Sequence, residues 1–501
     1  MTRIEHRLPQ LDPSSPILRQ LHQLLKKLGY HTAGIAPDFD GLDPSPNGVL
    51  PGSPLHSLVR LFFSQEPVEP PALREALKPL SLEQVLEAGF CHIDGEYILT
   101  NVLLQPYKDV IFAMGLPSLE TRPEEILMRI SSSSLEVAHL MVSRPARNAL
   151  DLGTGCGFLA TLLSKNSERV YAVDVNPIAV QFTEFNARWN GFPNITCLQG
   201  SLFEPVRHLR FDLIVSNPPF FIGPLPGSSA NHRLFQHSGH EGDSFCIQLA
   251  RDASTFLEED GYFQMMFSWF EFRGQDWGDK LAAVFSGLGC DVWGLRICQD
   301  SAEDYVSSLC SESDQTELDS FRQEGLRYFE QNNITSVGTG LLTLRRCSTR
   351  PNLLWFDEAP DDRSEPYGSA VAAIFDIRAR FDSATDDVLL QQIFTAAPGL
   401  VSIRKTSLQG CRWQITASEL ALESGLKYTF GDVDPLILRV VPYLDGCSSL
   451  HQVLERVSLE EHLPLGDVIA KRLPSFRELI RFGFLLPRDG SAISLPMANS
   501  K

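Results

Sequence analysis

The sequence of 501 residues predicts an α/β protein in which a central sheet with crossover helices is flanked by two helical domains. Strand and helix patterns alternate between residues 116 and 350, which is the order that builds a parallel sheet. Both flanking regions instead place apolar residues at helical spacing. Three domains are predicted. Residues 1–115 form a helical, winged-helix-like domain, and residues 116–350 form the α/β domain. Residues 351–501 form a linker and a small helical domain that also resembles a winged helix.

The N-terminal domain is predicted from two helical stretches and one short strand. Residues 17–25 have helical apolar spacing, and a second stretch begins near Leu55, after a connector rich in proline and glycine. Residues 97–99 indicate a short strand or wing. Some winged helices bind nucleic acid, whereas others bind protein or support a neighbouring domain, so the pattern leaves the role of this domain open.

The central domain has a clear order of elements. Strands are expected at residues 148–152, 169–174, 194–198, 211–216, 261–267, 291–298 and 340–346. Helices are expected at residues 158–166, from Pro177 to about Asn190, and from Asp243, as the capping residue, to about Leu257. A long acidic insertion separates the last two strands.

Charge and composition narrow the classes of function. The chain has 62 acidic and 43 basic residues, a net charge of −19, which argues against a general nucleic-acid binder but leaves room for a local basic patch. It has no apolar run long enough for a membrane span and no signal-peptide pattern at its polar start, so we expect a cytoplasmic protein. Its ten cysteines form no Cys-x-x-Cys pair, and Cys156 is interpreted as a small residue in a tight turn.

A glycine-rich turn marks the predicted cofactor site. It joins a strand to a helix, and its residues expected to contact a cofactor are Asp151, Gly153, Thr154, Gly155 and Gly157. Glycine allows the backbone to turn sharply and to approach a ligand closely. Asp174 ends the next strand, where a carboxylate can accept hydrogen bonds from both ribose hydroxyls of an adenosine.

The spacing of the glycines distinguishes between two nucleotide cofactors. A dinucleotide fold normally needs G-x-G-x-x-G and a pyrophosphate at the helix N-terminus, whereas this turn reads G-x-G-x-G. Asp151 would repel a pyrophosphate but attract the ammonium of a methionine group. The sequence therefore predicts S-adenosyl-L-methionine as the cofactor, with Val175, Ser201, Leu202 and Asn217 lining the same site.

These motifs resemble those of class I methyltransferases, and more closely the HemK/PrmC-like and "small-domain" nitrogen methyltransferases. The resemblance covers about residues 125 to 270, and its motifs are residues 151–157, 173–177, 199–205 and 211–220. It implies a Rossmann-like sheet. Ser201 departs from the family pattern, because an acidic residue near the adenine is common there.

Asn217, Pro218, Pro219 and Phe220 form the predicted catalytic motif, directly after a buried strand. The Asn217 side-chain carbonyl and the Pro218 backbone carbonyl can accept hydrogen bonds from one NH2 group. The prolines make the turn rigid, and Phe220 offers a face on which a planar group can stack. The resemblance implies methylation of a glutamine amide or an exocyclic base amine. Tyrosine in the last position is typical of the glutamine enzymes and phenylalanine is common among rRNA methylators, so the substrate stays open between protein and nucleic acid.

Other readings are weaker. His232, His237 and His240 follow the motif, but they lack the spacing of metal ligands, so no metal is expected. A nucleic-acid-binding module with a non-catalytic methyltransferase-like scaffold is the main alternative, although Asp174 and Asn217 are both present. A nicotinamide-dependent enzyme is disfavoured by the glycine spacing.

Overall fold

The computed structural model describes residues 11–31, 49–116, 129–220, 222, 243–308, 315–362 and 366–488. By its internal contacts the chain divides into two compact units. The first unit comprises Met1–Ala138, Pro145–Arg350 and Leu354–Asp357, and the second comprises His139–Arg144, Pro351–Leu353 and Glu358–Lys501. The division into three domains stays a prediction. Among the described helices, none combines the length and apolar content that a membrane crossing needs.

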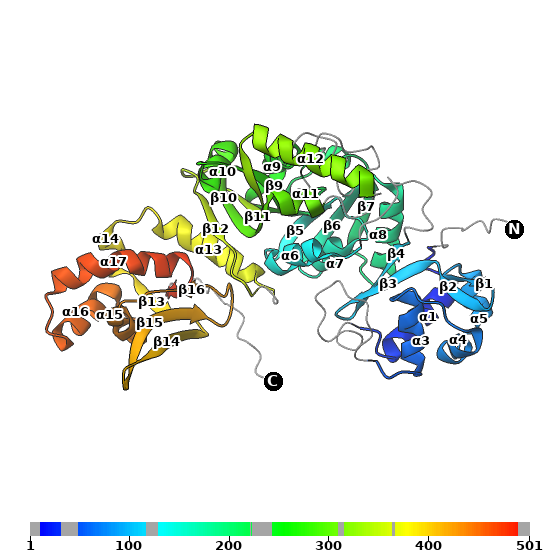
Figure 1. Ribbon diagram of the computed structural model, residues 1–501, viewed down its shortest axis with the longest axis horizontal. Helices are drawn as coiled ribbons and strands as arrows, with labels where there is room; N and C mark the ends of the chain where they lie inside the picture. Colours follow the sequence, from blue (N-terminus) through cyan, green and yellow to red (C-terminus); the bar gives the residue numbers. More distant parts are fainter. Residues whose placement is uncertain are drawn as a thin grey trace. The chain divides into compact units, whose positions relative to one another are not determined.

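A sheet of eight strands forms the centre of the first unit, in the order β12-β10-β11-β9-β8-β5-β6-β7 (Figure 1). The strands are β5 (Ala146–Leu152), β6 (Ser167–Asp174), β7 (Ile195–Gln199), β8 (Phe211–Ser216), β9 (Leu257–Phe272), β10 (Cys290–Ser301), β11 (Ile334–Arg346) and β12 (Leu354–Glu358). Strands β5 to β9 pair in parallel, as predicted. The expectation of a parallel sheet is wrong for β11, which runs antiparallel to both β9 and β10.

The three predicted helices are α7 (Phe158–Ser164), α8 (Pro177–Trp189) and α9 (Ser244–Phe256). Two helices that were not predicted, α6 (Ser132–Leu140) and α10 (Trp277–Phe285), lie before β5 and between β9 and β10. The acidic insertion forms α11 (Ala302–Ser308) and α12 (Gln315–Gln331). Asp243 precedes α9, but its side chain makes no cap hydrogen bond. Its carboxylate instead lies 2.9 Å from Lys280 Nζ, because an ammonium is a stronger partner than a backbone N–H.

The N-terminal segment of this unit contains helices and two hairpins. They are α1 (Pro16–Lys27), α3 (Pro54–Phe62), α4 (Pro70–Ala76), α5 (Leu82–Glu87), β1 (Cys91–Asp94), β2 (Tyr97–Thr100), β3 (Val102–Tyr107) and β4 (Val110–Gly115). The short strand expected at residues 97–99 is confirmed as β2, whereas the winged-helix assignment stays a prediction. Asn186 of α8 and Asn190, which follows its last residue, hold β4: Asn186 bonds to the N–H and C=O of Ala113, and Asn190 bonds to those of Ile111. Each side-chain amide thus binds a backbone N–H and C=O of β4 as a neighbouring strand would.

The second unit has its own hydrophobic core of leucine, valine, isoleucine and phenylalanine side chains. Its helices are α13 (Gly368–Phe381), α14 (Asp386–Gln391), α15 (Pro435–Val440), α16 (Leu450–Glu460) and α17 (Leu465–Arg481). Its strands are β13 (Ile393–Ala396), β14 (Leu400–Gln409), β15 (Arg412–Leu422), β16 (Thr429–Phe430), β17 (Asp445–Ser449) and β18 (Leu485–Pro487). The mixture of helices and strands is richer than the small helical domain that was expected, and the winged assignment here also stays a prediction.

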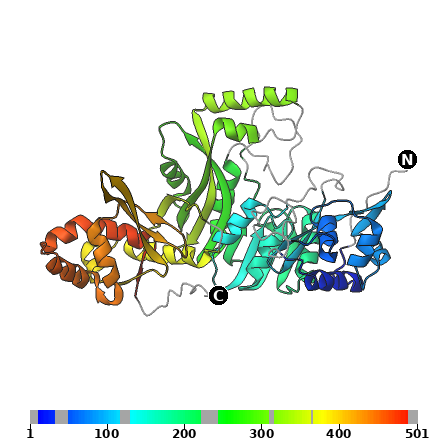
Figure 2. The same ribbon diagram turned by 60° about the horizontal axis from the view of Figure 1, so that its bottom comes forward.

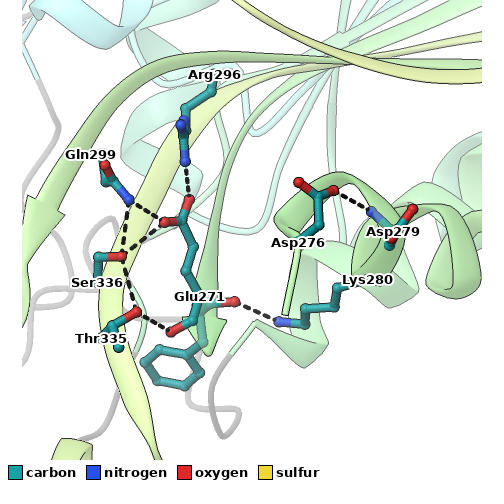
Figure 3. Close-up of polar contacts among 9 residues, drawn as sticks. Glu271, Asp276, Asp279, Lys280, Arg296, Gln299, Thr335 and Ser336 are labelled. Atoms are coloured by element: carbon teal, nitrogen blue, oxygen red, sulfur yellow. Dashed lines mark hydrogen bonds and ion pairs between the residues drawn. The ribbon is translucent and has the colours of Figure 1, made fainter. Parts of the chain in front are cut away.

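Strands β9, β10 and β11 are long, and α11 and α12 lie at one end of them (Figure 2). Near this end, the buried carboxylate of Glu271 accepts hydrogen bonds from Arg296 (2.7 Å), Ser336 (2.8 Å) and Gln299 (Figure 3). The Arg296 guanidinium also lies over the Trp277 ring, 4.9 Å from its centroid. These contacts join β9 to β10 and β11 through one charge.

Replacing Glu271 with alanine is expected to lower the free energy of unfolding of the first unit by about 3–5 kcal/mol, because Arg296 would be left partly buried without its counter-ion. Urea unfolding followed by tryptophan fluorescence measures this. Glu258→Ala is the control, since its ion pair with Arg147 is exposed and worth about 0–1 kcal/mol. Equal effects of the two changes would show that the Glu271 pair contributes no more than a surface pair.

Candidate functional site

The glycine turn follows β5 and leads into α7. Gly153, Gly155 and Gly157 all have positive φ (75°, 57° and 82°), a conformation that costs other residues free energy. A Cβ at Gly157 would lie 2.8 Å from Thr183 Cγ2 of α8, so this glycine also permits close packing. A Cβ at Gly153 or Gly155 would meet no described atom within 4 Å. The first part of the turn therefore borders open space, as a ligand-binding turn requires.

Asp174 closes this turn from the end of β6. Its Oδ2 accepts a hydrogen bond from Gly155 N (2.9 Å) and its Oδ1 accepts one from Asn176 N (2.9 Å). Burial raises the pKa of its carboxyl group, and these backbone donors lower it in part. A carboxylate has about four acceptor positions, so two backbone bonds leave acceptors for ribose hydroxyls. Asp174 thus shapes the turn in addition to its predicted contact with the cofactor, which stays a prediction.

Asp151 is buried beneath the turn, with 1% of its surface exposed. Its Oδ2 accepts hydrogen bonds from Thr154 Oγ1 (2.7 Å) and Ala160 N (2.8 Å). Its Oδ1 has no hydrogen-bond partner in the described part of the chain. Burial raises the pKa of Asp151 to about 7, and the nearby Asp174 charge adds to the shift. A buried carboxylate oxygen without a partner is suited to a cationic ligand group.

The remaining predicted cofactor residues lie after β6 and β7. Val175 is 58% exposed although it is apolar, and it follows Asp174 directly. Gly200 N donates to Asp174 O (3.0 Å), which holds the segment with Ser201 and Leu202 at the end of β6. Ser201 is exposed and Leu202 has a φ of 48°. Their contacts with an adenine stay a prediction.

The motif from Asn217 to Phe220 lies next to the glycine turn. Strands β5 and β8 pair Leu152 with Ser216, so Gly153 and Asn217 leave adjacent strands at the same edge of the sheet. Ser216 Oγ donates to Leu152 O (2.7 Å) and ties the two strands at this point. The carboxyl edge of a parallel sheet is where α/β proteins bind ligands. The structure therefore brings together the two motifs that the sequence singled out separately.

The amide nitrogen of the Asn217 side chain has hydrogen-bond partners, whereas its oxygen has none among the described residues. Its Nδ2 donates to Ser133 Oγ (3.1 Å) and Ser134 Oγ (3.0 Å), both from α6. Its Oδ1 is buried and has no hydrogen-bond partner within the described residues. Pro218 is buried, and Phe220 packs in part against the core of the sheet. Asn217 thus presents an unused acceptor at the carboxyl edge.

Two features of this site were missed from the sequence. Ser133 and Ser134 lie in a run of four serines, whose composition gave no signal of a contact more than 80 residues away. Tyr305 of α11 is buried, and its hydroxyl accepts from Ile222 N (2.7 Å) and lies 3.3 Å from Ile222 O. It therefore holds the backbone two residues beyond Phe220.

Two alternative chemistries, metal binding and thiol nucleophilicity, concern residues near the site. The described residues contain no group of three or more potential metal ligands. His232, His237 and His240 lie outside the described residues. Burial raises the pKa of Cys156 to about 12, so its thiol stays protonated at neutral pH and the interpretation as a turn residue holds.

The family model described as "Methyltransferase small domain" matches residues 131–267, which contain the glycine turn, Asp174 and Asn217. This part of the chain is thus similar to a methyltransferase small domain. The predicted resemblance and the class I methyltransferase fold class are thereby confirmed. The match covers the central sheet through β9 and leaves the N-terminal segment and the second unit outside the methyltransferase small domain.

Individual relatives align over the same part of the chain. A release factor glutamine methyltransferase from Aliivibrio fischeri is 31% identical over 34% of this chain and 61% of its own length. A protein with the same name from Geobacter sulfurreducens is 43% identical over 30% of this chain and 53% of its own length. A tRNA1(Val) (adenine(37)-N6)-methyltransferase from Actinobacillus pleuropneumoniae is 31% identical over 28% of this chain and 58% of its own length. The chain thus spans little more than half the length of these relatives.

Proposed function

We propose that this protein is an S-adenosylmethionine-dependent methyltransferase that methylates a planar nitrogen of a macromolecule. The observation that carries the proposal is the unpartnered, buried Oδ1 of Asn217 beside the glycine turn. This oxygen can accept only from a donor such as an N–H group. Its place next to the turn allows a donor nitrogen and a cofactor to meet at one edge of the sheet.

The residues around the turn fit the cofactor. Asp151 Oδ1 is a buried acceptor suited to the ammonium of the methionine part, and the space beside Gly153 and Gly155 admits a ligand close to the backbone. Asp174 retains acceptors for the ribose hydroxyls. When bound, S-adenosylmethionine supplies a methyl group already activated on a sulfonium, so the protein needs no nucleophilic side chain.

Catalysis by this chain then consists of orienting the acceptor nitrogen. Asn217 Oδ1 and the Pro218 carbonyl accept from the two hydrogens of one NH2 group, which directs the nitrogen lone pair toward the methyl group. Methylation makes these hydrogens more acidic, because positive charge develops on the nitrogen, and one proton then passes to solvent water. Two carbonyl oxygens stabilise that charge more in the transition state than in the ground state.

The relatives support both candidate substrates. Their names specify a glutamine of a release factor in one group and adenine N6 of a tRNA in the other, and each acceptor is a planar NH2 group. The residues that match the methyltransferase small domain fit either substrate, and we propose that the regions flanking them select between protein and nucleic acid. Because both substrates belong to translation, we also propose a cytoplasmic location.

Transfer of labelled methyl groups tests the proposal. The purified full chain is incubated with methyl-tritiated S-adenosylmethionine and an extract of cells that lack this protein, and the product is divided between nuclease and protease digestion. Label that survives nuclease but is released by protease identifies a protein substrate, and the reverse identifies a nucleic acid. Cofactor binding without any transfer to either class would favour the non-catalytic scaffold and refute the proposal.

A further inference from the structure

We infer that Ser133 and Ser134 of α6 are positioning residues that fix the orientation of the Asn217 amide; this rests on the proposed function. Each serine oxygen lies within hydrogen-bond distance of Asn217 Nδ2, at 3.1 Å and 3.0 Å. An amide nitrogen carries two hydrogens, so the two serines occupy both. Because the amide is planar, fixing its nitrogen also fixes the direction of Oδ1.

The third serine of this cluster supports the same orientation. Ser131 Oγ lies 2.8 Å from Ser133 Oγ and 3.2 Å from Ser134 Oγ. Besides the Ser134 N–H, Ser131 Oγ can accept one hydroxyl hydrogen, and the closer Ser133 hydroxyl can supply it, which leaves the Ser133 lone pairs for an amide hydrogen of Asn217. Ser131 Oγ also accepts from Ser134 N (3.3 Å) at the start of α6, so the cluster is held by the helix itself.

The orientation determines which atom the substrate meets. If the amide were turned by half a rotation, its NH2 would face the substrate NH2, and two donors would oppose each other. With the serines in place, the substrate meets an acceptor. The serines thus contribute, through Asn217, to the selection of a nitrogen that carries hydrogens.

A double-mutant cycle tests this inference with the full chain. The Ser133→Ala/Ser134→Ala variant is expected to lower the single-turnover rate of methyl transfer by about tenfold or more, toward the loss caused by removing an acceptor. Cofactor affinity should not change. In an Asn217→Ala background the same two changes should have no further effect, because serines that act through Asn217 lose their role with it. Ser133→Thr keeps the hydroxyl and should retain the rate in an otherwise unchanged chain.

Ser132→Ala is the matched control, because Ser132 is exposed on the same helix and should leave the rate unchanged. Equal losses with and without Asn217 would mean that the serines only stabilise α6, and an unchanged rate in the double variant would also overturn the inference.

A second readout does not depend on activity. In protein labelled with 15N-asparagine, the resonance lost in Asn217→Ala identifies the Asn217 side chain. Its amide hydrogens should exchange faster in the double serine variant; unchanged exchange would overturn the inference even if the wild-type protein transferred no methyl group.

Discussion

Asn217→Ala is expected to lower the rate of methyl transfer by about a hundred- to a thousandfold, the loss typical of removing one preorganised hydrogen-bonding group from a transition state. The change removes the unpartnered Oδ1, the acceptor on which the proposed orientation of the substrate nitrogen depends. The fold should persist, because Asn217 follows β8 and, among the described residues, its side chain makes hydrogen bonds to two serines of α6. Single-turnover transfer and calorimetric cofactor binding, measured side by side, separate the loss of rate from a loss of affinity.

Two further variants sharpen this result. Asn217→Asp preserves shape and acceptor capacity and adds a negative charge near the sulfonium, so it should bind the cofactor at least as tightly and retain part of the rate. Asn332→Ala removes an exposed asparagine after α12 and should leave the rate unchanged. A wild-type rate in Asn217→Ala would show that Asn217 is only a turn residue.

Asp151→Asn is expected to weaken cofactor binding by about tenfold to a hundredfold, since a hydrogen bond to a charged group is worth about 1.5–3 kcal/mol. Thr154 Oγ1 and Ala160 N both donate to Oδ2, so an asparagine must direct its carbonyl oxygen toward them. Its NH2 would then occupy the place of the unpartnered Oδ1 and face the ammonium of the cofactor. Two hydrogen-bond donors, the amide NH2 and the ammonium, would then face each other. Calorimetry measures the change, with the exposed Asp94→Asn as control.

The raised pKa of Asp151 adds a pH dependence with a definite sign. With a pKa of about 7 in the free protein, the carboxyl group is largely protonated below neutrality, and a cation binds its ionised form. Cofactor affinity should therefore fall by up to about tenfold per pH unit below pH 7. Asp151→Asn should remove this dependence. An equal slope in both proteins would assign it to another group.

The free energy of unfolding of the cofactor-free protein should fall as the pH rises, whereas cofactor affinity should increase. The folded pKa of Asp151 lies above its unfolded value of 3.8, so its contribution to stability is present at low pH and is lost as the pH rises toward 7. Asp151→Asn should remove this loss and stabilise the cofactor-free protein at pH 7 and above. Thermal unfolding without cofactor measures it, and a decrease in stability at that pH would contradict the assignment of the buried charge.

The sequence by itself determined the order of the central elements and both motifs of the site. Apolar periodicity and turn residues are local signals, so β8 at Phe211–Ser216 was predicted with its exact bounds, and the start of α8 followed from Pro177. The glycine turn was predicted for the same reason, because positive φ is a property of single residues. Parallel strands joined by crossover helices also have their carboxyl ends at one edge of the sheet.

Only the tertiary structure decided how the site is completed. Ser133 and Ser134 reach Asn217 across 84 and 83 residues, and Tyr305 reaches Ile222 across 83, and no local pattern encodes such pairs. The antiparallel direction of β11 has the same origin, since a strand shows its apolar spacing in either direction. The unused oxygens of Asp151 and Asn217 were also invisible in sequence, because a missing hydrogen bond depends on every atom that packing brings near it.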